Sequence, residues 1–264
     1  MAVHSNASAR GVSPYLPLNI DPAIERKIER VLLLAGKPVM RRPIAAAIVL
    51  EALPKACERD AELCEEVRGY LRRYMKSYGV TTLQVNAAYT SGSSRVPIPN
   101  QHGQSVDSNW QAIVSGFVQP SDYVILNAGG IAYDGYVTAT GSFASIGFDF
   151  AQLDIGYRDH WFSPLTDSST LISPEAKTMP SITLSNYRPL TPLGISYEVF
   201  AAEMSRQEGI EYFGSTTSGR PRLSGIQIGM EPASGYAIAM NRIMQFGGGA
   251  RNSGGLSQFL DALY

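Results

Sequence analysis

The 264-residue chain is nearly neutral, with 22 Lys and Arg against 23 Asp and Glu and a sequence pI near 6.3, which argues against nucleic-acid binding. Its longest apolar run, residues 44–50, falls far short of the roughly 18 to 20 residues of a transmembrane helix, so any membrane-spanning form would use strands. Residues 1–10 show no signal peptide, so either the protein is cytosolic or its true start is missing.

The composition changes at Gly79. The first 79 residues hold 22 of the 45 charged side chains, and the other 185 hold 23, of which Lys177 alone is a lysine. Glycine changes in the opposite direction, with four before Val80 and 21 from there on. An ordinary soluble domain is about 25% charged. With 23 charged side chains among 185 residues, the second part is far below that fraction, so it needs an apolar solvent or a very large core. We therefore expect two parts, residues 1–79 and residues 80–264.

Residues 1–79 predict a small antiparallel helical bundle. The first helix starts at the cap pair Asp21 and Pro22 and stops at Gly36, with apolar residues at helical spacing between them. A second, short helix is expected from Pro43 to the residue before Pro54.

The third helix is expected from its cap Asp60 to Gly79, with glutamates in the first turns and basic residues in the last. In one unbroken helix Cys57 and Cys64 would lie about 10 Å apart, too far for a disulfide. Pro54 and the Asp60 cap favour a turn between them, so a loop disulfide formed in an oxidising compartment is expected, two free buried thiols being the alternative.

After Val80 the hydrophobic period becomes two. Between Val106 and Val118 the even positions are mainly apolar or small, and polar residues alternate with them. A change of apolar parity after Phe150 is typical of a β-bulge. About eight strands are expected in all; the others lie near residues 81–90, 122–139, 143–157, 181–188, 194–204, 223–231 and 235–246.

Long alternating strands with aromatic residues near their ends are typical of a transmembrane β-barrel. The aromatic residues in question are Tyr89, Tyr123, Tyr133, Tyr136, Tyr157 and Tyr236. A soluble β-sandwich with one wet face gives the same alternation, but the low charge of residues 80–264 favours the barrel. The expected fold class is mainly β with N-terminal α: an antiparallel transmembrane β-barrel, partial in this chain, preceded by a small helical bundle.

The stretch from Asp154 to Ser205 resembles the capsule assembly protein Wzi family. That family shares a segment in which a Trp-containing turn precedes a Ser-, Leu- and Pro-rich run, and the matching positions here are Trp161, Ser169, Leu171, Ser173, Ala176, Met179, Pro180, Ile182 and Leu184. The opening YLPLNIDPAIERKIERVLLLAG, the cysteine pair and the QFGGGAR stretch ending at Arg251 look like further blocks of the family.

The resemblance implies an outer-membrane β-barrel whose periplasmic side is plugged or capped by residues 1–79, with residues 80–264 as part of the barrel. It implies a non-enzymatic, lectin-like role that anchors capsular or extracellular polysaccharide at the cell surface, with that polysaccharide and outer-membrane lipid as partners. Full members are longer, so an incomplete member is expected, and whether it folds alone is left open.

The residues that could support catalysis are few. The three histidines, His4, His102 and His160, form no metal-ligand pattern with the cysteines, and no cofactor motif is present, so no catalytic residue, metal or cofactor is predicted. Two alternatives stay open: a soluble or periplasmic glycoside hydrolase-like enzyme, and a plugged porin. The carboxylates considered for the hydrolase are Asp149, Asp154, Glu198 and Glu203.

The predicted polysaccharide-binding residues are Arg158, Asp159, His160 and Trp161. A flat aromatic face beside charged groups can stack a pyranose ring and hold its hydroxyls. Alternatively, Trp161 is an interfacial girdle residue and His160 only shapes a turn. The loop from Ser91 to Ser105 is polar enough either to face outward or to be disordered.

Overall fold

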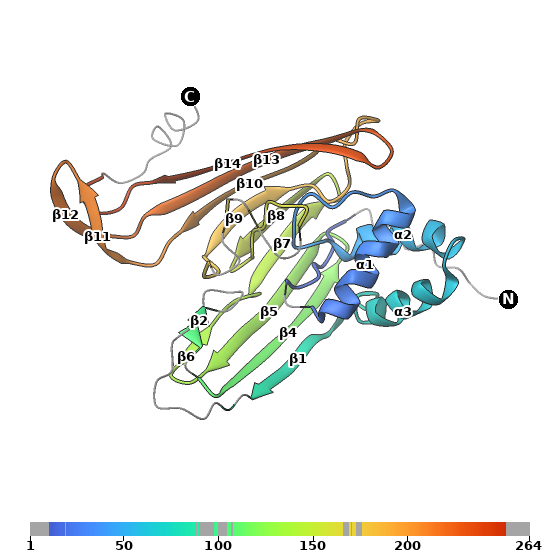
Figure 1. The fold of residues 1–264 in the computed structure, drawn as a ribbon, viewed down its shortest axis with the longest axis horizontal. Helices are drawn as coiled ribbons and strands as arrows, with labels where there is room; N and C mark the ends of the chain where they lie inside the picture. The colour runs from blue at the N-terminus through green and yellow to red at the C-terminus, as the bar shows by residue number, and fades with distance from the viewer. Residues whose placement is uncertain are drawn as a thin grey trace.

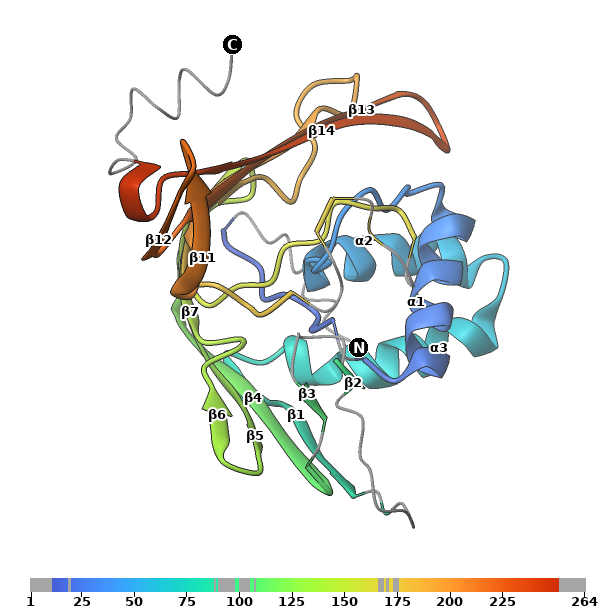
Figure 2. The ribbon, with the colours of Figure 1, turned by 60° about the vertical axis from the view of Figure 1, so that its left-hand side comes forward.

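Helices pack against the concave side of one large curved sheet (Figures 1 and 2). The structure is a computed structural model that describes residues 11–18, 20–87, 89, 98–99, 105–106, 108–165, 169, 171–172 and 176–251. The predicted outward loop at residues 91–105, together with His4 and His102, lies almost wholly outside these residues.

The N-terminal bundle consists of α1 (Pro22–Ala35), α2 (Ala46–Cys57) and α3 (Ala61–Leu71), followed by the 3-10 turn η1 (Arg72–Tyr74). The Asp21 side chain caps α1 by accepting from the Ala23 amide at 2.8 Å, and Gly36 ends it with a positive φ of 68°. A shared apolar core joins the helices; its buried members include Ile28, Leu32, Leu53, Val67 and Leu71.

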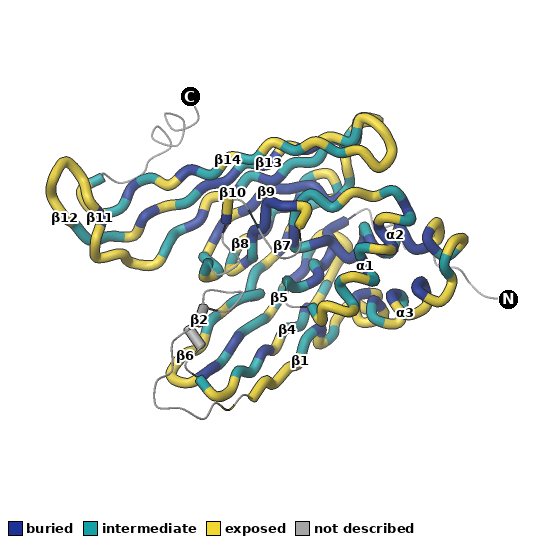
Figure 3. Tube along the Cα trace, viewed as in Figure 1, coloured by how far each residue is buried: buried dark blue, intermediate teal, exposed yellow. Residues whose placement is uncertain are grey.

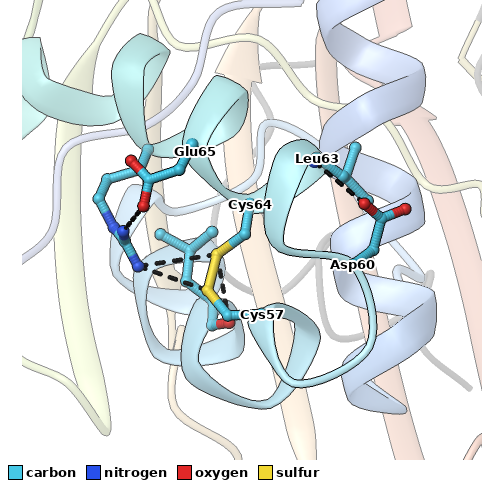
Figure 4. The surroundings of a disulfide bond; sticks show 7 residues. Cys57, Asp60, Leu63, Cys64 and Glu65 are labelled. Atoms are coloured by element: carbon cyan, nitrogen blue, oxygen red, sulfur yellow. Dashed lines mark hydrogen bonds and ion pairs between the residues drawn. A yellow bond between two sulfur atoms is a disulfide. The ribbon is translucent and has the colours of Figure 1, made fainter.

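A disulfide joins Cys57, the last residue of α2, to Cys64 in the first turns of α3 (Figure 4). The chain reverses direction between the helices, and the Asp60 side chain accepts from the Leu63 amide at 3.1 Å to begin α3. This reversal brings the two Cα atoms to 5.2 Å.

Two predicted helix boundaries were wrong. The second helix begins at Ala46 rather than Pro43, because the Ile44 carbonyl accepts from the Leu16 amide and Ala45 forms a β-bridge with Tyr15. That helix also continues through Pro54. Proline lacks a backbone N–H, but this removes only one helical hydrogen bond in the final turn, and the burial of neighbouring apolar residues compensates for it.

Gly79 is not a helix terminus. The third helix stops at Leu71, and Tyr74 then stacks on Phe117 of the sheet with 6.3 Å between ring centroids. The chain is already in the first strand at Tyr78, so Gly79 lies within a strand.

The remainder is antiparallel β-structure. The strands are β1 (Tyr78–Ala87), β2 (Ile98–Pro99), β3 (Ser105–Val106), β4 (Trp110–Ser121), β5 (Val124–Tyr133), β6 (Tyr136–Thr138), β7 (Phe143–Phe148), β8 (Ala151–Gly156), β9 (Ser181–Ser185), β10 (Ser196–Glu203), β11 (Gln207–Tyr212), β12 (Ser215–Gly219), β13 (Arg222–Ala233) and β14 (Tyr236–Phe246). A 3-10 turn, η2 (Gly249–Arg251), follows. The main sheet has the order β1-β4-β5-β7-β8-β9-β10-β13-β14, with β6 paired to β5. Within the described residues β1 and β14 remain edges and the sheet does not close.

Two predicted strands are hairpins. Residues 143–157 form β7 and β8, joined by a turn at Asp149 and Phe150, with Phe148 opposite Ala151. A two-residue turn shifts the apolar parity by one position, as a bulge does, which explains why the pattern was misread. Residues 122–139 likewise divide into β5 and β6, and the sequence did not predict the β11–β12 hairpin.

The two ends of the sheet differ. Short turns join β4 to β5, β7 to β8 and β13 to β14, and all three lie near the bundle. In the β4–β5 turn, the backbone carbonyl of Asp122 accepts from the Val12 amide at 2.8 Å. In the β7–β8 turn, the Asp149 carboxylate pairs with Arg188, which also contacts Glu51 of α2. Longer connections, including residues 157–180 and the projecting β11–β12 hairpin, leave the opposite end of the strands (Figure 1).

The two faces of the sheet differ in polarity. Buried and more exposed residues alternate along β8, β9 and β10 (Figure 3). The buried ones, on the concave face, are mainly polar, whereas the exposed ones between them are mainly apolar. Exposed outward residues include Leu83, Val114, Leu126, Ile146, Ile155, Ile182, Leu184, Ile228 and Met240. A soluble protein rarely exposes so extensive an apolar face.

Candidate functional site

Five charged or titratable side chains meet on the concave face. This interior charge cluster consists of Arg41, Asp154, Arg158, His160 and Glu198. The Arg158 guanidinium lies 2.9 Å from the Glu198 carboxylate and 3.2 Å from that of Asp154, and Arg41 lies 3.7 Å from Glu198. Period-two alternation on β8 and β10 points both carboxylates inward, where they are at most 1% exposed.

His160 completes the cluster. Its Nδ1 lies 2.9 Å from Glu198 and its Nε2 3.1 Å from the Ser181 hydroxyl, and its ring stacks on Phe200 with centroids 3.9 Å apart. Burial lowers the pKa of His160 below its ordinary value, and this outweighs the opposite effect of Glu198. A neutral ring that donates from Nδ1 to Glu198 fits these contacts, and the hydroxyls of Ser181 and Thr183 lie beside its Nε2.

Neutral His160 also balances the charge. Arg41 and Arg158 supply two positive charges, and Asp154 and Glu198 supply two negative ones. A protonated His160 would still contact Glu198 but would leave the buried cluster with a net positive charge, so the cluster is electrically balanced with a neutral ring.

The same cluster fastens the N-terminal part to the sheet. The Tyr15 hydroxyl donates to Asp154 at 3.1 Å, and the Arg158 guanidinium lies over the Tyr15 ring at 4.6 Å. Arg41 donates to the carbonyls of Asn186 and Tyr197, and Gln227 of β13 donates to the Met40 carbonyl at 2.9 Å. Buried polar contacts therefore bind the N-terminal part to the concave face of the sheet.

The predicted binding residues lie together but are mostly enclosed. Arg158, His160 and Trp161 are 2%, 8% and 6% exposed. The Trp161 indole donates to the Leu165 carbonyl at 2.9 Å, and the Trp161 backbone pairs with Arg42. Trp161 is therefore inside the curved sheet rather than in an outer girdle, and His160 does more than shape a turn. None of these three offers an open face to a sugar ring in this structure.

Asp159 is the least buried of the predicted binding residues. Its carboxylate accepts from the Thr178 hydroxyl at 2.5 Å, and Thr178 lines a cavity of about 720 Å³. This cavity lies at the ends of β8, β9, β10 and β13 away from the bundle, and its lining includes Tyr157, Lys177, Glu203, Arg206 and Arg220. Its volume is within the range of ligand sites.

Sequence reasoning did not find Tyr15, Arg41 or the cavity. Tyr15 and Arg41 lie in extended segments far along the chain from their partners, and no spacing rule joins them to Glu198. One signal for the cavity was present, because Lys177 is the single lysine after residue 79.

Within the described residues no group of three or more His, Cys, Asp or Glu side chains is arranged to hold a metal ion. The described helices include none that is long and apolar enough to cross a membrane.

The model of the capsule assembly protein Wzi family matches residues 61–264, more than three quarters of the chain. The chain belongs to this family. The match covers α3 and all the strands, and it confirms the family resemblance seen in the sequence. No curated protein matches the chain.

A solved structure of Wzi from Escherichia coli superposes on 94% of the chain with a TM-score of 0.68 and 16% identity. That protein is described as an outer membrane protein involved in group 1 capsule assembly and as a carbohydrate-binding β-barrel. The likeness confirms the expected fold class, antiparallel β with N-terminal helices. The chain spans 56% of the length of that structure.

Proposed function

We propose that this protein is a non-enzymatic outer-membrane β-barrel that binds capsular or extracellular polysaccharide and anchors it at the cell surface. Membership of the capsule assembly protein Wzi family carries the proposal. The description of the Escherichia coli structure as a carbohydrate-binding barrel supports it.

The outward face supports a membrane location. Ile182 and Leu184 of β9 are 56% and 44% exposed, and Ile155 of β8 and Ile228 of β13 are 50% and 46% exposed. In water, such a surface would promote association, whereas in a bilayer it faces hydrocarbon. Outer-membrane lipid is thus the proposed surround of residues 80–264.

The lengths of the connections support an orientation. Barrels of the outer membrane have short periplasmic turns and longer extracellular loops. The turns that join β4 to β5, β7 to β8 and β13 to β14 lie at the bundle end, where residues 186–195 form one longer connection, so residues 1–79 are proposed to be a periplasmic plug. The 720 Å³ cavity at the other end then faces outward, toward the polysaccharide.

The carboxylates considered for hydrolysis support binding rather than cleavage. Asp154 and Glu198 are 1% and 0% exposed and are both ion-paired to Arg158, so substrate has no open path to either in this structure. Asp149 pairs with Arg188 at the bundle end, and Glu203 pairs with Arg220. The direct role predicted for Arg158, Asp159, His160 and Trp161 stays a prediction, with Asp159 nearest the cavity.

The proposal is tested by deleting the gene from its own host and complementing it with the full-length form. Cell-bound and released polysaccharide are then quantified, and polymer length is measured. Anchoring predicts that deletion shifts polymer of unchanged length from cells to medium and that complementation reverses the shift. Unchanged retention, or longer polymer in the deletion strain because a cleaving activity is lost, would contradict the proposal.

A further inference from the structure

Lys177 stands apart from the other charges of the β-rich part. It is the single lysine among residues 80–264, it is exposed, and it lines the 720 Å³ cavity. Among the described residues it has no hydrogen-bond or ion-pair partner. Lysine is otherwise absent from residues 80–264, yet this one lines a large cavity at the end of the strands away from the bundle.

Two further cations line the same cavity. Arg206 pairs with Glu208 at 2.9 Å and Arg220 pairs with Glu203 at 2.8 Å, and both arginine side chains are more than 60% exposed. Exposed ion pairs contribute little to stability, so a ligand carboxylate can replace the protein carboxylate at small cost. Glu203 is the one acidic side chain among the described lining residues.

Apolar and aromatic groups complete the lining. Leu171, Met179 and Ile243 lie on the walls together with Tyr157, which is 37% exposed. Apolar C–H faces of a pyranose pack on such side chains, and its ring can stack on a tyrosine. The cavity therefore combines surfaces for sugar rings with cations for acidic substituents.

We propose that the cavity binds carboxylate-bearing polysaccharide, a polymer that contains uronic acid or a comparable acidic sugar, through Lys177, Arg206 and Arg220. An arginine side chain donates two parallel hydrogen bonds to a carboxylate, and a lysine side chain supplies a point positive charge. This inference rests on the proposed polysaccharide-binding function and narrows it to an acidic substrate class.

The test uses the full-length protein in detergent and polysaccharide extracted from the cells that express it. One portion of the polymer is left native, and in another the carboxylates are reduced to alcohols with carbodiimide and borohydride. Affinity is measured by titration calorimetry at low and high salt. We expect carboxyl reduction to weaken binding at least about tenfold and high salt to weaken binding of the native polymer.

Substitutions locate the effect. Lys177→Gln is expected to weaken binding of the native polymer about tenfold, and Lys177→Arg to keep the affinity within about threefold. Lys37→Gln makes the same charge change on the bundle side of the sheet, where Lys37 lines a different, smaller cavity, and is expected to leave affinity unchanged. Because Lys177 is exposed, its substitution leaves the fold intact.

The outcomes separate the two proposals. Equal affinity for native and reduced polymer, or a polymer without carboxylates, would overturn the acidic-substrate inference and leave polysaccharide binding standing. Equal effects of Lys177→Gln and Lys37→Gln would overturn the assignment to this cavity. No binding of either polymer would overturn the proposed function itself, and the inference with it.

Discussion

Removing the Arg158 guanidinium should strongly destabilise the protein. In Arg158→Met, the Glu198 and Asp154 carboxylates lose a cation at 2.9 and 3.2 Å while staying buried. At an effective dielectric of about 20, unit charges about 3 Å apart attract by about 5 to 6 kcal/mol, which gives roughly 11 kcal/mol for two contacts. Removing the charge also relieves several kcal/mol of its desolvation, so the expected loss is about 3 to 5 kcal/mol.

The assay is urea unfolding of the full-length protein in detergent micelles, monitored by tryptophan fluorescence. Trp161 is a suitable probe because it directly follows His160 of the interior charge cluster in the sequence. Arg206→Met removes an arginine that is 63% exposed and should cost no more than about 1 kcal/mol. Adding Glu198→Gln to Arg158→Met removes one stranded carboxylate. The double variant should therefore lose less than the sum of the singles, by at least about 1 kcal/mol.

Two results would refute this reasoning. One is an Arg158→Met variant within about 1 kcal/mol of wild type, which would mean that the carboxylates find solvent or other partners. The other is additivity of the two substitutions within about 0.5 kcal/mol, which would mean that Arg158 and Glu198 do not interact.

Three further predictions address the helical bundle, the outward face of the sheet and the buried histidine. Replacing Cys57 and Cys64 by alanine opens a loop with a sequence separation of seven and should cost roughly 2 to 3 kcal/mol, visible as faster proteolysis within residues 22–74. Ile182→Arg should cost about 2 to 4 kcal/mol in micelles if this 56% exposed residue faces lipid; a loss below about 0.5 kcal/mol would indicate that it faces water. Because burial lowers the pKa of His160, the unfolded state takes up the proton first, so stability should fall as the pH drops below about 6.5 toward the folded-state pKa. His160→Gln should flatten this slope below about pH 6.5, and an unchanged slope would assign the effect to other groups.

The sequence predicted features that depend on neighbouring residues. Asp21 and Gly36 bound the first helix because capping uses atoms within one turn. The alternation along residues 106–118 matches the outward Val114 and Val118 of β4, because side-chain direction in a strand follows period two.

Features that depend on distant partners could not be read in the same way. The α2 start is set by pairing of Ile44 with Leu16, and the hairpin at Asp149 gives the same parity change as a bulge. The Arg158 to Trp161 segment was predicted as one binding unit because its residue types suit sugars. After β8 the chain turns back into the concave side of the sheet, and three of the four residues of this segment are buried there. The spacing of residues in the sequence does not encode this turn.

Detergent dependence of the full-length protein tests the central claim most directly. The protein is expressed in its host, located by membrane fractionation and analysed by sedimentation velocity with and without detergent. An outer-membrane barrel with an apolar outer face should be in the outer-membrane fraction, be monodisperse in micelles and aggregate when detergent is removed. Protein that is recovered outside the membrane fraction and stays monodisperse without detergent would contradict the account.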